Sequence, residues 1–543
     1  MSVKGRKARL AATAGLAAAL ALGGVVAPVA QAYADSGYTV TVQAPTGSEY
    51  AVDGEYKIYQ LFTGTFGGTD NKHLGNVVAN PTYLNTVLTT LDSVLPAEQK
   101  INTSGMSEAR IAIAITDAIH GLTTTDAQKF ANELAGALAT SGTTATQSAS
   151  DGTVVFNVNE TGYYLITSSS ASGANTSAIL VPVNRNVTAE TKVSTPTVTK
   201  QVKVNDEDYK KNTDVGLTNA TTVEKLTYKL EGTVASNIDD YDAYKYVFKD
   251  TLPKGVTADA SRVAQWNVTC KVAYNGAEHA IPEGRFAVSF ATNTTDNTTE
   301  ISWTCADLVK AMNDAGLSSN HGDASIILEY TPNYTAEELR NALPNAGMAS
   351  VNNKVKLEYS NNPYSGSESS TGTTTTDESK VYTYKLSLSK VKAGANNTTS
   401  PLPGAKFTLK RGETSIFADQ EVGTDGTLAF VGLDSGVEYE LSETAVPAGM
   451  KSIDPIKFKI SATKDADGTV TQVTASKTSD PSSAATFVNT IDTDNVIDVT
   501  ITNIEGPDLP TTGQQGIVAG VAVGGIVLTV SLVAISRNRK RSE

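Results

Sequence analysis

Histidine and cysteine are scarce in this chain, which has four His and two Cys among 543 residues. None of them has the spacing of a metal site, such as CxxC or HExxH. The sequence therefore predicts no metal and no cofactor, and gives little support to nucleophilic catalysis by a Cys-His or Ser-His pair. Two short acidic segments, 465–468 and 492–494, suggest calcium, although acidic surface turns are the commoner explanation.

Basic residues are also in the minority. Lys and Arg number 43 against 57 Asp and Glu, which gives a formal net charge of -14. Because binding to nucleic acid requires basic side chains that neutralise phosphates, no nucleic-acid partner is expected. At about 150 residues per domain, the length indicates roughly three domains, each large enough to bury its own core.

The first 34 residues have the composition of a secretory signal peptide. Basic residues come first, an apolar segment follows at 10–29, and small residues suited to signal peptidase come last. We expect residues 1–34 to be removed and the chain to be exported. In an exported chain the two thiols, Cys270 and Cys305, would most often form a disulfide; the alternative is two unpaired buried thiols.

The other end carries three features in order: a short motif, an apolar segment at 514–536 and a basic tail at 537–543. The motif consists of Leu509, Pro510, Thr511, Thr512 and Gly513. The apolar segment is close to the ~20 residues that cross a bilayer, and the tail favours the cytoplasmic side. This order resembles the LPxTG sorting signal of Gram-positive wall-anchored proteins, which implies cleavage after Thr512 by a sortase and attachment to peptidoglycan. An ordinary membrane anchor is the alternative.

Alternating polar and apolar residues, rich in Val, Ile, Thr and Tyr, dominate the region between the ends and predict half-buried strands. The segments are 38–42, 154–158, 163–166, 198–202, 226–230, 355–359, 384–388 and 498–502. Helical periodicity is local: we expect helices over 107–119, from Thr125 onwards, and near Ala306 and Ala336. The chain is therefore predicted to be mainly β, with tandem β-sandwich domains and a few helices in the first two.

Changes in composition divide the exported part. We expect an N-terminal domain at 35–193, a middle domain at 194–364 and a C-terminal domain at 380–508. The segment 365–379 is rich in Ser, Thr and Gly and cannot bury enough apolar surface to fold alone. It is predicted to be a linker.

Four segments of the C-terminal domain, 384–390, 401–409, 439–449 and 499–503, together resemble a collagen-adhesin B-type domain, an immunoglobulin-like β-sandwich. The resemblance implies that Lys390 joins Asn503 through a side-chain amide, an isopeptide bond. Glu443 would assist as the acid of the element called the E-box in pilins. The sequence departs from the family pattern at Val446 and Met450, which affects packing rather than the acid.

Three segments of the middle domain, 196–200, 248–255 and 353–363, resemble the isopeptide-forming middle domain of sortase-assembled backbone pilins, of collagen-adhesin A type. The resemblance implies Lys200 as the amine, Asn353 as the amide and Asp250 as the assisting acid. A register error of one residue moves a side chain to the opposite face of a sheet. Lys203 and Asn352 are therefore the alternatives.

Burial gives each triple its chemistry. Desolvation drives a Lys towards its neutral, nucleophilic form and a carboxyl towards its protonated form. We expect the protonated acid to hydrogen-bond the Asn carbonyl and polarise it, while the strands hold amine and amide together at an effective molarity of ~10⁵ M or more. The alternative is that all six are solvated strand and turn residues.

The junction between the first two domains carries a further lysine. Segments 55–62 and 160–166 resemble the N-terminal domain of backbone pilins, in which Lys57, Glu160 and Asn184 could form a third crosslink. Lys192 stands where such pilins place the lysine of a pilin motif, here in degenerate form. The resemblance implies that Lys192 attacks the thioester that a class C sortase makes with Thr512 of the next subunit. Lys200 is the competing acceptor.

These resemblances imply a secreted backbone subunit of a sortase-assembled pilus on the cell-wall surface, which supports adhesion and is not an enzyme. The implied partners are class C and housekeeping sortases, identical subunits head to tail, minor tip and base pilins, peptidoglycan, and a host glycan or matrix protein. A monomeric wall-anchored or pilus-tip adhesin is the alternative. A surface hydrolase is a further alternative, without a motif to support it.

Overall fold

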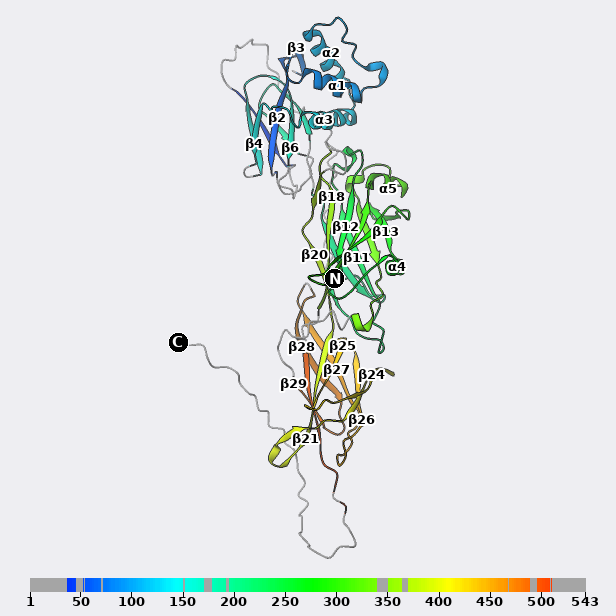
Figure 1. Cartoon of the computed structure of the whole chain (residues 1–543). Helices are drawn as coiled ribbons and strands as arrows, with labels where there is room; N and C mark the ends of the chain where they lie inside the picture. Colours follow the sequence, from blue (N-terminus) through cyan, green and yellow to red (C-terminus); the bar gives the residue numbers. More distant parts are fainter. Residues whose placement is uncertain are drawn as a thin grey trace, which may run out of the picture.

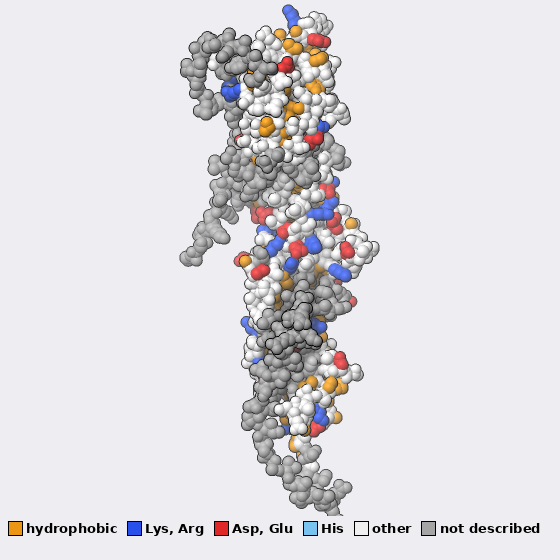
Figure 2. Space-filling view, turned by 90° about the vertical axis from the view of Figure 1, so that its left-hand side faces the viewer, with side chains coloured by type: hydrophobic (Ala, Val, Ile, Leu, Met, Phe, Trp, Pro, Cys, Tyr) orange, Lys and Arg blue, Asp and Glu red, His pale blue; other side chains and the backbone are white. Residues whose placement is uncertain are grey.

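A computed structural model of the chain shows β-rich domains that follow one another along a rod (Figure 1). The residues that it describes are 37–44, 52, 54–69, 72–149, 152–169, 178–191, 195–338, 350–363, 370–466, 468–488, 496–507 and 509. Figure 2 shows acidic and basic side chains intermixed over the middle of the rod among the residues that the structure describes. The prediction of a mainly β chain, with tandem β-sandwich domains and a few helices in the first two, is confirmed.

The first domain has three layers: a small sheet, a larger sheet and a group of helices on the outer face of the larger sheet (Figure 1). The small sheet has the order β5 (Thr153–Val158), β1 (Tyr38–Gln43), β8 (Val187–Glu190). The larger sheet has the order β3 (His73–Ala79), β2 (Glu55–Gly67), β6 (Gly162–Ser169), β7 (Ala178–Val183), with β4 (Ala145–Ser148) paired to β2. The helices are α1 (Leu84–Val94), η2 (Ala97–Gln99), α2 (Glu108–His120) and α3 (Thr124–Leu138).

Two of these helices were expected from the sequence. The helix predicted over 107–119 is α2, and the helix predicted from Thr125 is α3, whose N-cap Thr123 accepts a hydrogen bond from the Asp126 amide. Helix α1 was missed, although its buried residues Leu84, Val87 and Leu91 recur at helical spacing. Strand β2 buries both of its faces, one against the small sheet and one against the helices.

The middle domain is a sandwich of two sheets. One has the order β14 (Ala277–Ala280), β13 (Thr269–Tyr274), β17 (Ser325–Tyr330), β11 (Leu226–Thr233), β9 (Val198–Val204). The other has the order β10 (Asn212–Asp214), β20 (Asp377–Tyr382), β18 (Ser350–Ser360), β12 (Tyr246–Thr251), β16 (Thr298–Cys305), β15 (Ala287–Asn293), with β19 (Thr371–Thr373) paired to β18. Its short helices are η3 (Ile238–Asp240), α4 (Ala260–Val263), α5 (Leu308–Asp314) and η4 (His321–Asp323).

The predicted linker at 365–379 is wrong over most of its described length. Residues 371–373 form β19, and β20 begins at Asp377 and pairs with both β18 and β10. The segment is ordered despite its polar composition because neighbouring strands supply its hydrogen-bond partners. The side chain of Asp377 also accepts a hydrogen bond from the Lys200 amide at 2.7 Å, so this segment helps to hold β9 in place.

The third domain is a second sandwich. One sheet has the order β22 (Thr399–Pro401), β21 (Tyr384–Ala393), β30 (Val496–Asn503), β29 (Ala485–Val488), with β25 (Thr427–Leu433) paired to β21. The facing sheet has the order β24 (Thr414–Glu421), β23 (Lys406–Arg411), β26 (Glu438–Ala445), β27 (Ile456–Lys464), β28 (Val470–Ser479). A short helix, η5 (Ala395–Asn397), follows β21. Strands β21 and β30, the first and the last of the domain, run parallel side by side.

The middle and third domains share one continuous apolar core. A loop of the middle domain reaches the third domain, where the Leu217 amide donates to the Gly432 carbonyl at 2.9 Å. Gly432 has a φ of +97°, and a Cβ there would lie 2.9 Å from Leu217 Cγ, so glycine is required on both counts. Arg411 of the third domain lies 2.7 Å from Glu224 of the middle domain. The two domains are therefore closely joined.

The predicted disulfide is not formed in the structure. Cys270 on β13 and Cys305 on β16 belong to different sheets, and both are free thiols. Burial raises the pKa of Cys305 to about 11 and raises the pKa of Cys270 as well. Because the thiolate is the reactive form, a raised pKa makes each thiol less nucleophilic at neutral pH. The structure thus has the alternative of two unpaired buried thiols.

Several expectations lie outside the described residues. They include the signal peptide at 1–34, Lys192, the motif residues Pro510 to Gly513, the apolar segment at 514–536 and the basic tail at 537–543. Within the part of the chain that the structure describes, no helix is long and apolar enough to cross a membrane.

Candidate functional site

The third domain brings together Lys390, Glu443 and Asn503. Lys390 lies on β21 and Asn503 on the adjacent parallel strand β30, two residues further along in register, so the two side chains project from the same face. Glu443 comes from β26 of the facing sheet. The side chains of Lys390 and Glu443 are fully buried, and Asn503 is 1% exposed.

Glu443 contacts both nitrogen atoms of this cluster. Its carboxylate Oε1 lies 3.2 Å from Lys390 Nζ, and Asn503 Nδ2 donates to both carboxylate oxygens at 3.1 Å. Lys390 Nζ donates to Asn503 Oδ1. Burial lowers the pKa of Lys390 below its usual value, which favours the nucleophilic amine. The expected contact between the acid and the Asn carbonyl is therefore replaced by a contact with the amide nitrogen.

The middle domain assembles a second cluster across its two sheets. Lys200 on β9 belongs to one sheet, while Asp250 on β12 and Asn353 on β18 belong to the other. All three are completely buried. The alternatives lie elsewhere: Lys203 is only partly buried, with its ammonium 4.8 Å from the ring of Tyr209, and Asn352 occupies the opposite face of β18.

A tyrosine that the sequence analysis missed lies at the centre of this second cluster. The hydroxyl of Tyr330, at the end of β17, donates to Asp250 Oδ2 at 2.9 Å and accepts from Asn353 Nδ2 at 2.7 Å. Lys200 Nζ donates to Asp250 Oδ2 and lies 3.4 Å from the Tyr330 hydroxyl. No motif signals Tyr330, because one buried tyrosine in a strand has the same pattern as any other core residue.

Burial sets the electrostatics of the middle-domain cluster. It lowers the pKa of Lys200 to about 8 and raises the pKa of Asp250, although each partner partly offsets the shift of the other. Asp250 Oδ1 and Asn353 Oδ1 are buried and have no hydrogen-bond partner among the described residues. A buried oxygen without a hydrogen bond raises the free energy of the folded state. The three separate side chains are therefore less stable here than a cluster with all its hydrogen bonds made.

Both clusters place a lysine amine with a lowered pKa beside a carboxamide and an acid. This arrangement suits transfer of the Asn acyl group to the Lys nitrogen, with loss of ammonia. No other species is needed to balance the reaction. In the described part of the chain, no group of three or more His, Cys, Asp or Glu side chains could hold a metal ion. At 465–468, Asp465 accepts a hydrogen bond from the Thr469 amide, as in an ordinary turn.

The first domain offers no comparable cluster at Lys57. The Lys57 side chain is 36% exposed, and its ammonium lies 3.9 Å from Glu55. Glu160 accepts a hydrogen bond from Gln60 at 2.9 Å rather than from a lysine. Lys57 is thus open to solvent, unlike the buried Lys200 and Lys390.

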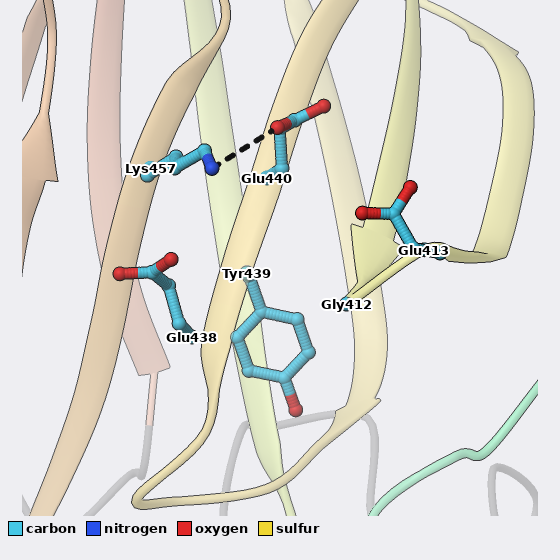
Figure 3. A pocket seen from close by; sticks show the side chains of 6 residues that line it. All are labelled: Gly412, Glu413, Glu438, Tyr439, Glu440 and Lys457. Atoms are coloured by element: carbon cyan, nitrogen blue, oxygen red, sulfur yellow. Dashed lines mark ion pairs between the residues drawn. The ribbon is translucent and has the colours of Figure 1, made fainter.

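A surface pocket of the third domain, drawn in Figure 3, has no lining residue in common with either cluster. It is lined by Gly412, Glu413, Glu438, Tyr439, Glu440 and Lys457. The Lys457 ammonium lies 3.6 Å from Glu440, which also faces Lys410 at 3.6 Å. Exposed ion pairs of this kind contribute little to stability.

Comparisons with known proteins agree with this architecture. Residues 384–478 match the family model of the SpaA prealbumin-like fold domain. No curated protein sequence matches the chain. Among solved structures, the chain is similar to the T6 backbone pilin of serotype M6 Streptococcus pyogenes, which is described as a modular three-domain structure. The TM-score is 0.50 and the identity 16%, over 88% of this chain and 100% of that one.

Two further solved structures are similar, both from Corynebacterium diphtheriae. The full-length major pilin SpaD has a TM-score of 0.44 and 15% identity, over 87% of this chain and 98% of that one. The major pilin SpaA has a TM-score of 0.44 and 16% identity, over 86% and 100%. At such identities a likeness to a solved structure is one of fold. The chain thus has a modular fold like that of the T6 backbone pilin, and its residues 384–478 match the SpaA prealbumin-like domain.

Proposed function

We propose that this chain is the structural backbone subunit of a covalently polymerised surface pilus. The observation that carries the proposal is the pair of dry lysine, acid and asparagine clusters, one in each of two successive domains of a pilin-like fold. A hydrolase or a simple binding module has no use for two such clusters inside its cores. In a subunit that is pulled along its length, covalent crosslinks formed by these clusters would resist mechanical unfolding.

Each cluster forms one isopeptide bond. The neutral lysine nitrogen attacks the Asn side-chain carbonyl carbon, the new C–N bond replaces the bond to Nδ2, and Nδ2 leaves as ammonia. One proton passes from the lysine nitrogen to the leaving nitrogen. In the third domain Glu443 lies close enough to both nitrogens, at 3.2 and 3.1 Å, to carry that proton itself.

The position of the crosslinks supports a mechanical role. Lys390 lies on the first strand of the third domain and Asn503 is the last residue of its final strand. A pull applied between the two ends of this domain would therefore pass through the covalent bond and leave the intervening strands unloaded. Lys200 and Asn353 occupy the first and a late strand of the middle domain in the same way.

Polymerisation would join Thr512 of one subunit to Lys192 of the next. Two features support this choice. Leu509, which opens the sorting motif, is 83% exposed and thus within reach of an enzyme. Lys200, the competing acceptor, is completely buried and bound to Asp250, so a sortase could reach it only after the middle domain opened. A class C sortase would make the polymer.

The remaining partners follow from the same proposal. A housekeeping sortase would attach the finished polymer to peptidoglycan, and minor pilins would occupy its tip and base. The pilus would then be secreted, anchored to the wall and able to support adhesion to a host glycan or matrix protein. The monomeric wall-anchored or tip adhesin is retained as an outcome of the test below.

The test is polymer formation in the native host. Boiled, reduced wall extracts should contain a ladder of high-mass species for the wild type. Lys192→Arg should abolish the ladder while the monomer still reaches the wall, because a guanidinium stays protonated and cannot attack the thioester. Thr512→Ala should abolish both. Lys200→Arg should keep the ladder and lose only the crosslink of the middle domain.

Lys203→Arg is the matched control, since Lys203 lies on the same strand but outside the cluster. A single wild-type band would favour the adhesin. A ladder that survives Lys192→Arg but not Lys200→Arg would move the acceptor to Lys200. Survival of the ladder in both variants would contradict the head-to-tail scheme.

A further inference from the structure

The two clusters differ in how the acid reaches the leaving nitrogen. In the third domain the Glu443 carboxylate contacts Lys390 Nζ and Asn503 Nδ2 directly. In the middle domain the acid is Asp250, whose side chain is one methylene shorter. Asp250 contacts Lys200 Nζ, but its hydrogen bonds do not extend to Asn353 in the described structure.

The hydroxyl of Tyr330 fills the position that the shorter acid leaves open. It lies 2.9 Å from Asp250 Oδ2 and 2.7 Å from Asn353 Nδ2. Its ring is held by aromatic neighbours on several sides, with centroid distances of 5.4 Å to Tyr228, 5.5 Å to Trp266 and 5.3 Å to Trp303. The hydroxyl is therefore fixed between the acid and the nitrogen that must depart.

We propose that Tyr330 is a catalytic proton relay for isopeptide formation in the middle domain, an inference that rests on the crosslink proposed above. When Lys200 Nζ adds to the Asn353 carbonyl carbon, Nδ2 loses its amide conjugation and becomes a hydrogen-bond acceptor. The Tyr330 hydroxyl then turns towards Nδ2 and donates its proton, while the phenol oxygen takes a proton from Asp250 Oδ2.

The cycle closes without any outside reactant. The emptied Asp250 Oδ2 accepts the surplus proton of Lys200 Nζ, with which it is already in contact. The bond from Cγ to Nδ2 breaks, and Nδ2 leaves as ammonia. Tyr330 ends as a neutral phenol and Asp250 ends as an acid, so both are returned to their starting forms. The net change is one proton moved from the attacking nitrogen to the leaving nitrogen.

The experiment is a time course of crosslinking in the full chain with Tyr330→Phe. The chain is translated in a cell-free reaction, and samples are denatured and digested at each time point. Mass spectrometry then follows the loss of one ammonia from the peptides that contain Lys200 and Asn353. Phenylalanine keeps the ring packing and removes the relay. General acid–base groups contribute about 10²–10⁴-fold to rate, and a slowing of the middle-domain bond in that range is expected.

Two internal references separate chemistry from folding. The bond between Lys390 and Asn503 in the same molecule should form at the wild-type rate. Tyr246→Phe removes another buried hydroxyl of the same core, which donates to the Thr233 carbonyl at 2.8 Å, and should leave both crosslinking rates unchanged. If Tyr246→Phe slowed the middle-domain bond as much as Tyr330→Phe does, the slowing would be explained by a general loss of packing. That result would overturn the relay.

A rescue variant keeps the proposal testable if Tyr330→Phe does not crosslink at all. Adding Asp250→Glu lengthens the acid by one methylene and should let it reach Nδ2 directly, as Glu443 does, so that the double variant regains at least tenfold in rate over Tyr330→Phe alone. Failure of that rescue would contradict the relay. If the wild type forms no bond between Lys200 and Asn353, the proposed crosslink is wrong. If the wild type forms the bond and Tyr330→Phe forms it at the same rate, only the proposed relay is wrong.

Discussion

Glu443 holds both of its carboxylate oxygens 3.1 Å from the amide nitrogen of Asn503. The acid therefore faces the group that must leave rather than the carbonyl that is attacked. Its main task in this geometry is to move a proton between two nitrogens, because one of the same oxygens lies 3.2 Å from Lys390 Nζ.

Glu443→Gln should leave the third domain uncrosslinked, since an amide cannot exchange the proton. The intact mass should rise by one ammonia relative to the crosslinked form, after correction for the substitution. Because a bond that closes a loop of about 100 residues limits the unfolded chain, its loss should lower the free energy of unfolding by ~4–5 kcal/mol. Mass spectrometry and thermal unfolding measure the two effects. Glu440→Gln, on the same strand but at the surface, should change neither; a crosslinked Glu443→Gln protein would refute the assignment.

The rate of crosslinking in the middle domain should depend on pH through the proton that Lys200 and Asp250 share. Below the Lys200 pKa of about 8, the pair keeps this proton, and the reactive arrangement of neutral amine and protonated acid is a constant fraction of it. Above that pH the proton is lost, the acid is a carboxylate, and the rate should fall about tenfold per pH unit. A cell-free time course between pH 6 and 9.5 tests this. A rate that instead rises towards pH 8 and then levels would show that only the free amine matters.

Cys270 and Cys305 should react slowly with an alkylating agent in the native protein, because Cys305 is buried and Cys270 is partly buried. Unfolding in denaturant without reductant should then release two reactive thiols per chain, as measured by mass after labelling. If both cysteines stay unlabelled until reductant is added, the secreted protein carries the disulfide that its sequence suggests.

Stability of the junction between the middle and third domains should fall as pH rises from about 4 to 7. Burial, with Glu224 nearby, raises the pKa of Asp434 to about 7, whereas a carboxyl in the unfolded chain titrates near 3.9. The folded state therefore binds the proton more tightly, and its advantage is complete at low pH and lost once the pH exceeds about 7. Arg411, at 3.5 Å, offsets part of the effect.

Asp434→Asn mimics the protonated form. It should flatten the change in melting temperature between pH 4 and 8 and make the protein more stable than the wild type at pH 8. Glu413→Gln, an exposed acid of the same domain, is the control and should behave as the wild type does. An Asp434→Asn protein with the full wild-type pH dependence would place the titrating group elsewhere.

Strand and helix identity followed largely from local pattern. The alternation in 198–202, 226–230 and 384–388 corresponds to β9, β11 and β21, because each of these strands buries one face. The exception is β20 with β19. Their Ser and Thr composition predicted a linker, but pairing with β18 and β10 supplies an ordered backbone. Local composition does not record partners that are far away in the chain.

For the site, the residue types and their order could be read from the amino-acid sequence: each of two domains has a lysine in an early strand, then an acid, then a late asparagine. The order of these residues along the chain follows the order of the strands, and the motifs shared with the pilin families identify each residue. The atoms that come into contact follow from the tertiary structure. Tyr330 lies between Asp250 and Asn353. In the third domain the acid contacts the nitrogen that leaves. At the junction of the middle and third domains, Arg411 contacts both Glu224 and Asp434. These contacts depend on how two sheets face each other across a dry core, or on how two domains meet, and no spacing along one strand encodes such distances.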